Sequence, residues 1–263
     1  MRALILSAGL GERLRPLTNV RAKPAIEFLN MPMLTFPYYW LNTLELSDIT
    51  FNTHYLPETI RHAAMRVVDP AIRLHFTHEE TILGSGGGIW NSRFHLQGDS
   101  CFAVANGDGV IVCKEDDVLV NMLKFHQDQD ALATLLVCPL DGVGTRIPGV
   151  WMTSDGEVMN FGLEARGPGM ECLHYASFML LNERIWNYLP RGSPTFSTMS
   201  CSRGLWTVSR CGRSGSTECD GSRPETRGTI WPRRSVASKR SGTVQASAAA
   251  YAEFLTATLR PSN

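Results

Sequence analysis

The chain has 263 residues, of which 43% are hydrophobic, and its 25 basic side chains balance 25 acidic ones. This length accommodates one large α/β domain or two small ones with a substantial core. No apolar run is long enough to span a bilayer and no signal segment begins the chain, so we expect a cytoplasmic protein that does not contact membranes. The seven cysteines lack paired C-x-x-C spacing, which predicts free thiols and no zinc site.

The first predicted element is a buried strand, because residues 3–6 form a short apolar run. It leads into a loop with two glycines, Gly9 and Gly11, whose backbone can approach a phosphate closely because glycine has no Cβ. Arg13 and Lys23 bring positive charge to the same loop. These residues predict a loop that binds a nucleoside triphosphate, although a glycine-rich surface turn is the alternative. The pattern G-x-x-x-x-G-K-[ST] of a Walker loop is missing.

The motif G-x-G-x-R-x-x-P-x-T-x-x-x-x-K-P runs from Gly9 to Pro24 and resembles the signature loop of the sugar-1-phosphate nucleotidyltransferases. Its seven fixed positions follow a strand, which argues against a chance match. The resemblance implies two catalytic residues, Arg13 on the β- and γ-phosphates and Lys23 near the α-phosphate. It also implies nucleotide binding by the whole loop, through Ala8, Gly9, Leu10, Gly11, Glu12, Arg13 and Lys23.

The next elements alternate between helix and strand. Apolar spacing predicts helices over residues 32–45 and 57–67, and β-branched or apolar runs predict strands over 49–52 and 72–76. This alternation is typical of a parallel, doubly wound sheet that binds its ligand at the carboxyl ends of the strands. His54 follows such an end, where a packing or capping role and a functional role are both open.

A second motif contains three successive glycines, at positions 86–88. Such a run disfavours a helix interior, so we expect it to open a helix where the backbone must approach something closely. A flexible hinge is the alternative. In the family that the chain resembles, this segment packs on the nucleobase, which implies nucleotide contacts from Glu80, Gly86 and Gly87.

A buried strand is also predicted over residues 101–105, directly before Asn106-Gly107-Asp108. A carboxylate at a strand end beside a phosphate-binding loop suits Mg²⁺, which prefers carboxylate and phosphate oxygens. The family carries a similar motif here, and the resemblance implies that Asp108 is a catalytic metal ligand and that Asn106 contacts the nucleotide. An ordinary Asn-Gly-Asp turn is the alternative.

The following segment is predicted to contain an amphipathic helix over residues 116–127 and an apolar strand over 131–137. His126 is expected to face solvent among polar neighbours and is given no role. Two short strands over 148–152 and 157–161 are expected to form a hairpin.

The last predicted strand covers residues 174–181, and a short helix is expected from Asn182. Relatives in the resembled family have a Glu-Lys pair and a Phe-Thr-Gly segment that contact the sugar phosphate. Here Glu164 matches the glutamate and Ser177 stands in place of the glycine, so both are implied sugar-binding residues. The lysine is missing, so the sugar phosphate must be held differently or by Arg166.

The pattern changes after residue 194. Residues 1–190 carry 14 basic and 21 acidic side chains, whereas residues 191–250 carry 10 and 3. Few aliphatic residues remain, so we expect a nucleotidyltransferase domain over 1–194 and an irregular, poorly ordered segment over 195–263. The family's second metal ligand is missing there, and neither Asp220 nor Glu225 follows an apolar strand. A shifted reading frame from about residue 195 and a genuine basic tail are the two explanations.

These features predict an α/β fold with a doubly wound, mixed but mainly parallel sheet of the Rossmann-like, GT-A-like type. The resemblance implies transfer of a nucleotidyl group from GTP or UTP to a sugar-1-phosphate, with Mg²⁺ and without specific nucleic-acid binding. Within the family, the chain is most similar to N-acetylmuramate-1-phosphate uridylyltransferases and mannose-1-phosphate guanylyltransferase-like proteins. A catalytically weak nucleotide-sugar binding or regulatory domain is the alternative. The sequence leaves the oligomeric state open.

Overall fold

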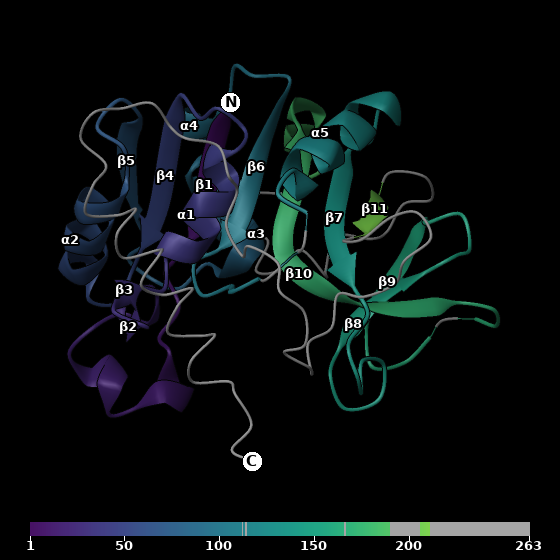
Figure 1. Ribbon diagram of the computed structural model, residues 1–263, viewed down its shortest axis with the longest axis horizontal. Coiled ribbons are helices and arrows are strands. Elements are labelled where there is room, and N and C mark those ends of the chain that lie inside the picture. The colour runs from purple at the N-terminus through teal and green to yellow at the C-terminus, as the bar shows by residue number, and fades with distance from the viewer. Residues whose placement is uncertain (112, 114, 166, 190–205, 211–263) are drawn as a thin grey trace, which may run out of the picture.

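A computed structural model describes residues 1–111, 113, 115–165, 167–189 and 206–210. Its centre is a nine-stranded sheet with the order β11-β7-β10-β6-β1-β4-β5, to which β8 and β9 attach through β10 (Figure 1). The strands of this sheet are β1 (Arg2–Leu6), β4 (Asp48–Thr53), β5 (Arg73–His78), β6 (Cys101–Asn106), β7 (Ala133–Cys138), β8 (Gly149–Met152), β9 (Val158–Gly162), β10 (Glu171–Asn182) and β11 (Trp206–Arg210).

The sheet is mixed but mainly parallel, as predicted. Strands β1, β4, β5 and β6 pair in parallel, β10 runs antiparallel to both β6 and β7, and β11 is again parallel to β7. All strands along the main path except β10 therefore point the same way. Their carboxyl ends meet at one edge, where the loop that follows β1 lies at the bottom of Figure 1.

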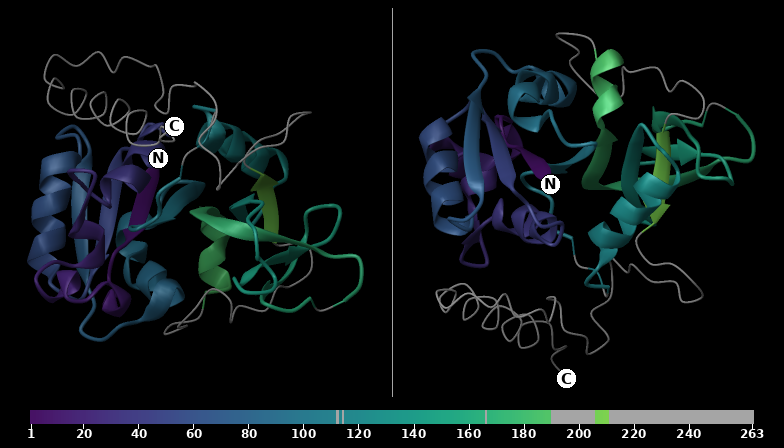
Figure 2. Two further views of the ribbon diagram at one scale, coloured as in Figure 1. Left: turned by 60° about the horizontal axis from the view of Figure 1, so that its bottom comes forward. Right: turned by 90° about the horizontal axis from the view of Figure 1, so that it is seen from above.

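Helices cover both faces of the sheet (Figure 2), because successive residues of a strand point to opposite sides. Ala3 and Ile5 belong to one buried cluster with residues of α1, α2 and α5, whereas Leu4 belongs to another with residues of α3 and α4. This two-sided core confirms the doubly wound fold. The helices are α1 (Thr35–Asn42), α2 (Pro57–Val67), α3 (Gly84–Asn91), α4 (Arg93–Leu96) and α5 (Val118–Asp128).

Two hairpins complete the described part of the chain. Strands β2 (Glu27–Phe28) and β3 (Met31–Pro32) pair within the segment before α1. Strands β8 and β9 form the predicted hairpin, which extends the amino-terminal half of β10. Among the described residues, no helix combines the length and apolar character needed to cross a membrane.

Strand β11 lies beyond the expected domain boundary at residue 194. Its five residues pair with β7, with Val208 opposite Leu135, and Val208 is buried. The segment 195–263, which we expect to be irregular, therefore contains a regular strand that pairs with the sheet. The sites of Asp220 and Glu225, and most of the segment 195–263, lie outside the described residues.

Candidate active site

The loop after β1 folds back on itself at the carboxyl edge of the sheet. Gly11 has a left-handed backbone with φ 64°, and a Cβ at this position would lie 2.8 Å from Thr18 Cγ2 and 3.0 Å from Lys23 Cβ. The buried Thr18 donates from Oγ1 to the Gly11 carbonyl over 3.0 Å. Glycine is therefore required at position 11 for both its conformation and its lack of a side chain. Gly9, in contrast, is exposed and has no atom within 4 Å of such a Cβ.

Lys23 and Asp108 come together at this edge. The Lys23 Nζ donates a hydrogen bond to Asp108 Oδ2 and forms an ion pair with it, and the two side chains are 27% and 34% exposed. Asp108 follows β6 through Gly107, whose N–H donates to the Leu6 carbonyl over 2.8 Å. A Cβ on Gly107 would lie 2.8 Å from that carbonyl oxygen, so the turn needs glycine. The end of the β1 loop and the carboxylate after β6 thus form one partly exposed charged site.

Arg13 lies on the same loop but is left free by its neighbours. It belongs to the short 3-10 helix η1 (Glu12–Leu14), its side chain is exposed, and no described residue pairs with its guanidinium. Lys23 begins η3 (Lys23–Ala25) after Ala22, whose N–H donates to Thr59 Oγ1 over 3.1 Å. The loop is therefore fixed to helix α2 near Lys23, while the guanidinium of Arg13 remains available to an anion.

The glycine run lies within α3, as the third to fifth of its eight residues, so the helix begins at Gly84 and not at the run itself. All three glycines are buried, and a Cβ on Gly88 would lie 2.6 Å from Asn52 Nδ2 and 3.0 Å from Glu79 Oε1. The close approach that glycine permits is therefore made to two side chains at the ends of β4 and β5. Of the adjacent glutamates, Glu80 is exposed and Glu79 is buried.

A buried polar network ties these strand ends together. Ser7 N–H donates to Asn52 Oδ1 over 2.7 Å, and Asn52 Nδ2 donates to Glu79 Oε1 over 2.7 Å. Glu79 Oε2 accepts from the N–H of Leu83 over 3.0 Å, just before α3 begins. Sequence reasoning did not identify Ser7, Asn52 or Glu79. The only local signal was polarity at the end of apolar strands.

His54 extends the same region through its ring. Its Nδ1 lies 2.8 Å from the carbonyl oxygen of Glu79, so this side chain packs against and bonds to the segment after β5. The sequence left a packing or capping role and a functional role open for His54. The contact with the Glu79 carbonyl is of the first kind.

The comparison with protein families shows which family this chain belongs to. Residues 2–143 match the family model described as nucleotidyl transferase, and this match covers more than half of the chain. The chain belongs to the nucleotidyl transferase family. The matched region contains the β1 loop, the glycine run of α3 and Asp108, all of which lie at the carboxyl edge.

Curated relatives agree with this family. A mannose-1-phosphate guanylyltransferase catalytic subunit beta from Dictyostelium discoideum is 28% identical over 61% of this chain and 44% of its own length. A mannose-1-phosphate guanyltransferase from Aspergillus fumigatus is 33% identical over 54% of this chain and 38% of its own. A UTP--glucose-1-phosphate uridylyltransferase from Synechocystis sp. is 29% identical over 61% of this chain and 43% of its own. The chain therefore spans less than half the length of these relatives.

Solved structures confirm the fold of this nucleotidyl transferase. HddC from Yersinia pseudotuberculosis, solved with GMP-PN, superimposes with a TM-score of 0.64 at 20% identity, covering 80% of this chain and 89% of that chain. A putative glucose-1-phosphate thymidylyltransferase from Bacillus anthracis, solved with a sucrose, superimposes with a TM-score of 0.66 at 18% identity, covering 81% and 87%. Both share the architecture described above.

The two residues expected to bind sugar in this nucleotidyl transferase lie on different elements, Ser177 in β10 and Glu164 after β9. Ser177 lies at an irregularity of β10 and has a left-handed backbone with φ 64°, the conformation that favours glycine. It lies against the residue after Asp108, because a Cβ on Gly109 would be 2.7 Å from Ser177 Oγ. Glu164 is exposed after β9, and its carbonyl accepts from Asn160 Nδ2 over 2.8 Å. Arg166 lies outside the described residues.

Asp108 is the carboxylate that the resemblance expects to hold a metal. Asp108 is partly exposed at a strand end, and Mg²⁺ is commonly held by one or two carboxylates together with substrate phosphates and water. Within the described residues, no group of three or more His, Cys, Asp or Glu side chains could hold a metal ion. Asp108 therefore fits a metal shared with a substrate better than a metal held by protein alone.

The expectation that His126 faces solvent is wrong. The side chain is 2% exposed, and its Nδ1 lies 2.8 Å from Thr134 Oγ1 on β7. Burial lowers the pKa of His126 to about 4, which keeps the ring neutral. The i, i+4 spacing of Val118, Met122 and His126 on α5, all buried, was the available signal.

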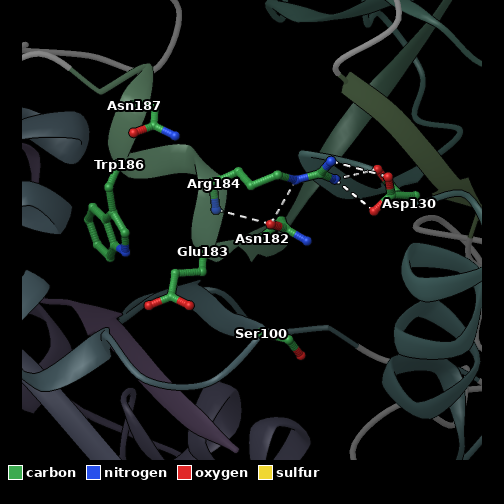
Figure 3. Close-up of a pocket in the computed structure, with 7 residues that line it drawn as sticks. All are labelled: Ser100, Asp130, Asn182, Glu183, Arg184, Trp186 and Asn187. Carbon is green, nitrogen blue, oxygen red and sulfur yellow. Dashed lines mark hydrogen bonds and ion pairs between the residues drawn. The ribbon is translucent and has the colours of Figure 1, made fainter.

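A pocket at the other edge of the sheet is not part of this site (Figure 3). It is lined by Ser100 before β6 and by Asn182 and Arg184 at the end of β10. The guanidinium of Arg184 already bonds to Asp130, at 2.8 Å for the Nη2 to Oδ1 pair, and to the Asn182 side chain. Arg184 therefore joins two parts of the fold and has little capacity left for an anion.

Proposed function

We propose that this nucleotidyl transferase transfers a nucleotidyl group from a nucleoside triphosphate to a sugar-1-phosphate, giving a nucleotide sugar and pyrophosphate. The observation that carries the proposal is the contact between Lys23 and Asp108. It joins the end of the β1 loop to the strand-end carboxylate in one partly exposed place. The curated relatives have names of this reaction type, and they do not favour the alternative of a binding or regulatory domain.

In the proposed reaction, an oxygen of the sugar phosphate attacks the α-phosphorus of the triphosphate, and the bond to the β-phosphate oxygen breaks. The protein contributes alignment and positive charge. Lys23 would stabilise charge on the α-phosphate, Arg13 would bind the departing β- and γ-phosphates, and main-chain N–H groups of residues 8–12 would hold the triphosphate. Asp108 would hold Mg²⁺, which when bound supplies further positive charge to the phosphates.

The remaining nucleotide contacts are proposed around α3 and β6. Gly86 and Gly87 would lie under the base with Glu80 beside it, and Asn106 would contact the nucleotide from the end of β6. Ser177 and Glu164 would contact the sugar phosphate, with Ser177 favoured by its position against Gly109. GTP is the first nucleotide to test and UTP the second, because several relatives are named guanyltransferases.

A coupled pyrophosphate-release assay tests the proposal. Purified full-length chain is incubated with GTP, UTP, ATP or dTTP, with Mg²⁺, and with mannose-, glucose- or N-acetylmuramate-1-phosphate. We expect release that requires both substrates, and mass spectrometry should find the matching nucleotide sugar. Nucleotide binding without any sugar-dependent release would contradict the proposal and support a binding domain.

A further inference from the structure

A series of hydrogen bonds with a fixed direction joins the β1 loop to the start of α3, the two segments proposed to bind the nucleotide. Ser7 begins the β1 loop, Asn52 is the penultimate residue of β4, and Glu79 follows β5 directly before the segment that leads into α3. Each of the three side chains is 2% exposed. The first N–H of the β1 loop and the N–H of Leu83 are the two ends of this network. The β1 loop and the start of α3 are therefore joined through buried side chains and not only through the sheet.

The direction of the bonds defines which atoms each residue must supply. Ser7 N–H requires an acceptor, so the amide oxygen of Asn52 faces it and the amide nitrogen faces Glu79. Glu79 then receives two donors, Asn52 Nδ2 on Oε1 and Leu83 N–H on Oε2. A carboxylate accepts at both oxygens, whereas an amide accepts at one atom and donates at the other. Only an acidic side chain satisfies both donors at position 79 while Asn52 keeps its orientation.

We propose that Asn52 and Glu79 are positioning residues that set the distance between the triphosphate-binding loop and the segment under the nucleobase. This inference rests on the proposed function. Both side chains are buried, so they would act through Ser7 and Leu83 without touching the nucleotide. Gly88 packs directly on both of them, which places the glycine helix on the same support. Buried charge-assisted hydrogen bonds of this kind are stronger than neutral ones and hold a defined geometry.

Single isosteric substitutions should break the network. In Glu79→Gln, the amide nitrogen must face either Asn52 Nδ2 or Leu83 N–H, and both of these are donors. Turning the Asn52 amide would relieve the first conflict, but it would place a donor against Ser7 N–H. In Asn52→Asp, two buried carboxylates would face each other, so one of them must take up a proton to restore the central bond. Glu79→Gln therefore leaves buried polar atoms unsatisfied, whereas Asn52→Asp makes the network depend on the uptake of a proton.

The double substitution should repair what each single one breaks. With Asn52→Asp and Glu79→Gln together, the new carboxylate accepts from Ser7 N–H and from the glutamine amide nitrogen. The glutamine oxygen then accepts from Leu83 N–H. Every bond is restored with the central one reversed, and the formal charge of the pair is unchanged.

The test measures dissociation constants for GTP and UTP by calorimetry on the full chain, with KM values for nucleotide and sugar phosphate where turnover occurs. We expect E79Q to weaken nucleotide binding about tenfold or more, as for loss of one well-formed buried hydrogen bond. The KM for the sugar phosphate should stay within about twofold. The double variant should recover to within about threefold of the wild-type affinity.

Thr50→Val is the matched control, because Thr50 is buried on the same strand and its hydroxyl has no hydrogen-bond partner among the described residues. It should leave the nucleotide affinity unchanged. If N52D alone does not fold, the test compares E79Q with the double variant. Wild-type affinity in E79Q, or a double variant that binds no better than E79Q or does not fold, would overturn the positioning role. If the wild-type protein binds nucleotide but transfers no nucleotidyl group to a sugar phosphate, only the proposed function is overturned.

Discussion

The two edges of the sheet use charged residues in opposite ways. At the amino edge, the carboxylate of Asp48 is 7% exposed and accepts from Arg73 Nε and Nη2, both at 2.7 Å, and lies 2.9 Å from His75 Nε2. At the carboxyl edge, Arg13 has no described partner, and the contact between Lys23 and Asp108 stays open to solvent.

This difference separates stabilisation from binding. A charge with several fixed partners contributes to folding and has no free donors or acceptors, whereas an exposed charge beside glycine-rich turns can exchange its partner for a ligand. The arginine in the pocket of Figure 3 is also fully paired, because Arg184 there bonds to Asp130 and Asn182. Changes to the exposed charges at the carboxyl edge should therefore impair activity, and changes to the paired charges at the amino edge should impair stability.

Asp108 should give the largest effect. Asp108→Ala and the isosteric Asp108→Asn should each lower kcat by about 10²–10³, because a charge at the reaction centre is lost. The thermal unfolding midpoint should change little, since the side chain is about one third exposed. Steady-state pyrophosphate release measures the first effect and calorimetry the second. Retention of most activity in Asp108→Asn would remove Asp108 from the proposed site.

Arg13 should follow closely. Arg13→Ala should lower kcat/KM by about 10²-fold or more if its guanidinium stabilises the departing phosphates. Arg21→Ala is the matched control, because Arg21 lies in the same loop and is exposed, with an ion pair to Glu27 at 3.4 Å. The control should remain within about twofold of wild type. Equal losses in both variants would indicate a general charge effect on nucleotide binding.

Gly88 lies at the carboxyl edge but should affect stability, because it packs on two buried side chains. A methyl group there would collide with Asn52 Nδ2 and Glu79 Oε1, both buried and held by hydrogen bonds, so Gly88→Ala should destabilise the fold by about 1–3 kcal/mol. The gain in helix propensity, about 1 kcal/mol, offsets only part of this. Denaturant unfolding should show the loss in Gly88→Ala and little change in Gly9→Ala, which meets no neighbouring atom. Equal stability of the two variants would contradict the packing account.

The sequence predicted what depends on local pattern. Apolar runs located the strands that bear the site, and the motif from Gly9 to Pro24 together with Asn106-Gly107-Asp108 led to the family that the comparisons confirm. The contact between Lys23 and Asp108 agrees with their expected proximity. Their catalytic roles remain predictions.

What the sequence did not reveal depends on distant partners. Glu79 and Glu80 are equivalent by local pattern, and only the positions of Asn52 and Leu83 distinguish the buried one. Strand β11 lies in a polar part of the sequence. It forms by pairing in parallel with β7, a partner distant in the sequence. His126 was assigned to the surface from its polar neighbours, although its spacing on α5 placed it among buried residues.

The amino edge gives the smallest expected effect, and it concerns stability alone. The hydrogen bonds from Arg73 hold the pKa of Asp48 well below its usual range, so the ionised carboxylate stabilises the folded state. Because the folded pKa is depressed, this contribution is complete above the unfolded value of about 3.9 and is lost as the pH falls toward the folded value. Asp48→Asn should therefore lower the free energy of unfolding at pH 7 by about 1–2 kcal/mol, with kcat unchanged.

The pH dependence separates this charge effect from a packing defect. Below about pH 4 the Asp48 carboxylate of the unfolded wild type begins to take up a proton while that of the folded protein stays ionised, so the stability difference between wild type and Asp48→Asn should shrink as the pH is lowered. Urea unfolding at a series of pH values from 7 to about 2.5 measures it. A difference that stays constant over this range would mean that the variant lost packing or hydrogen-bond geometry, and a fall in kcat would break the division between the two edges.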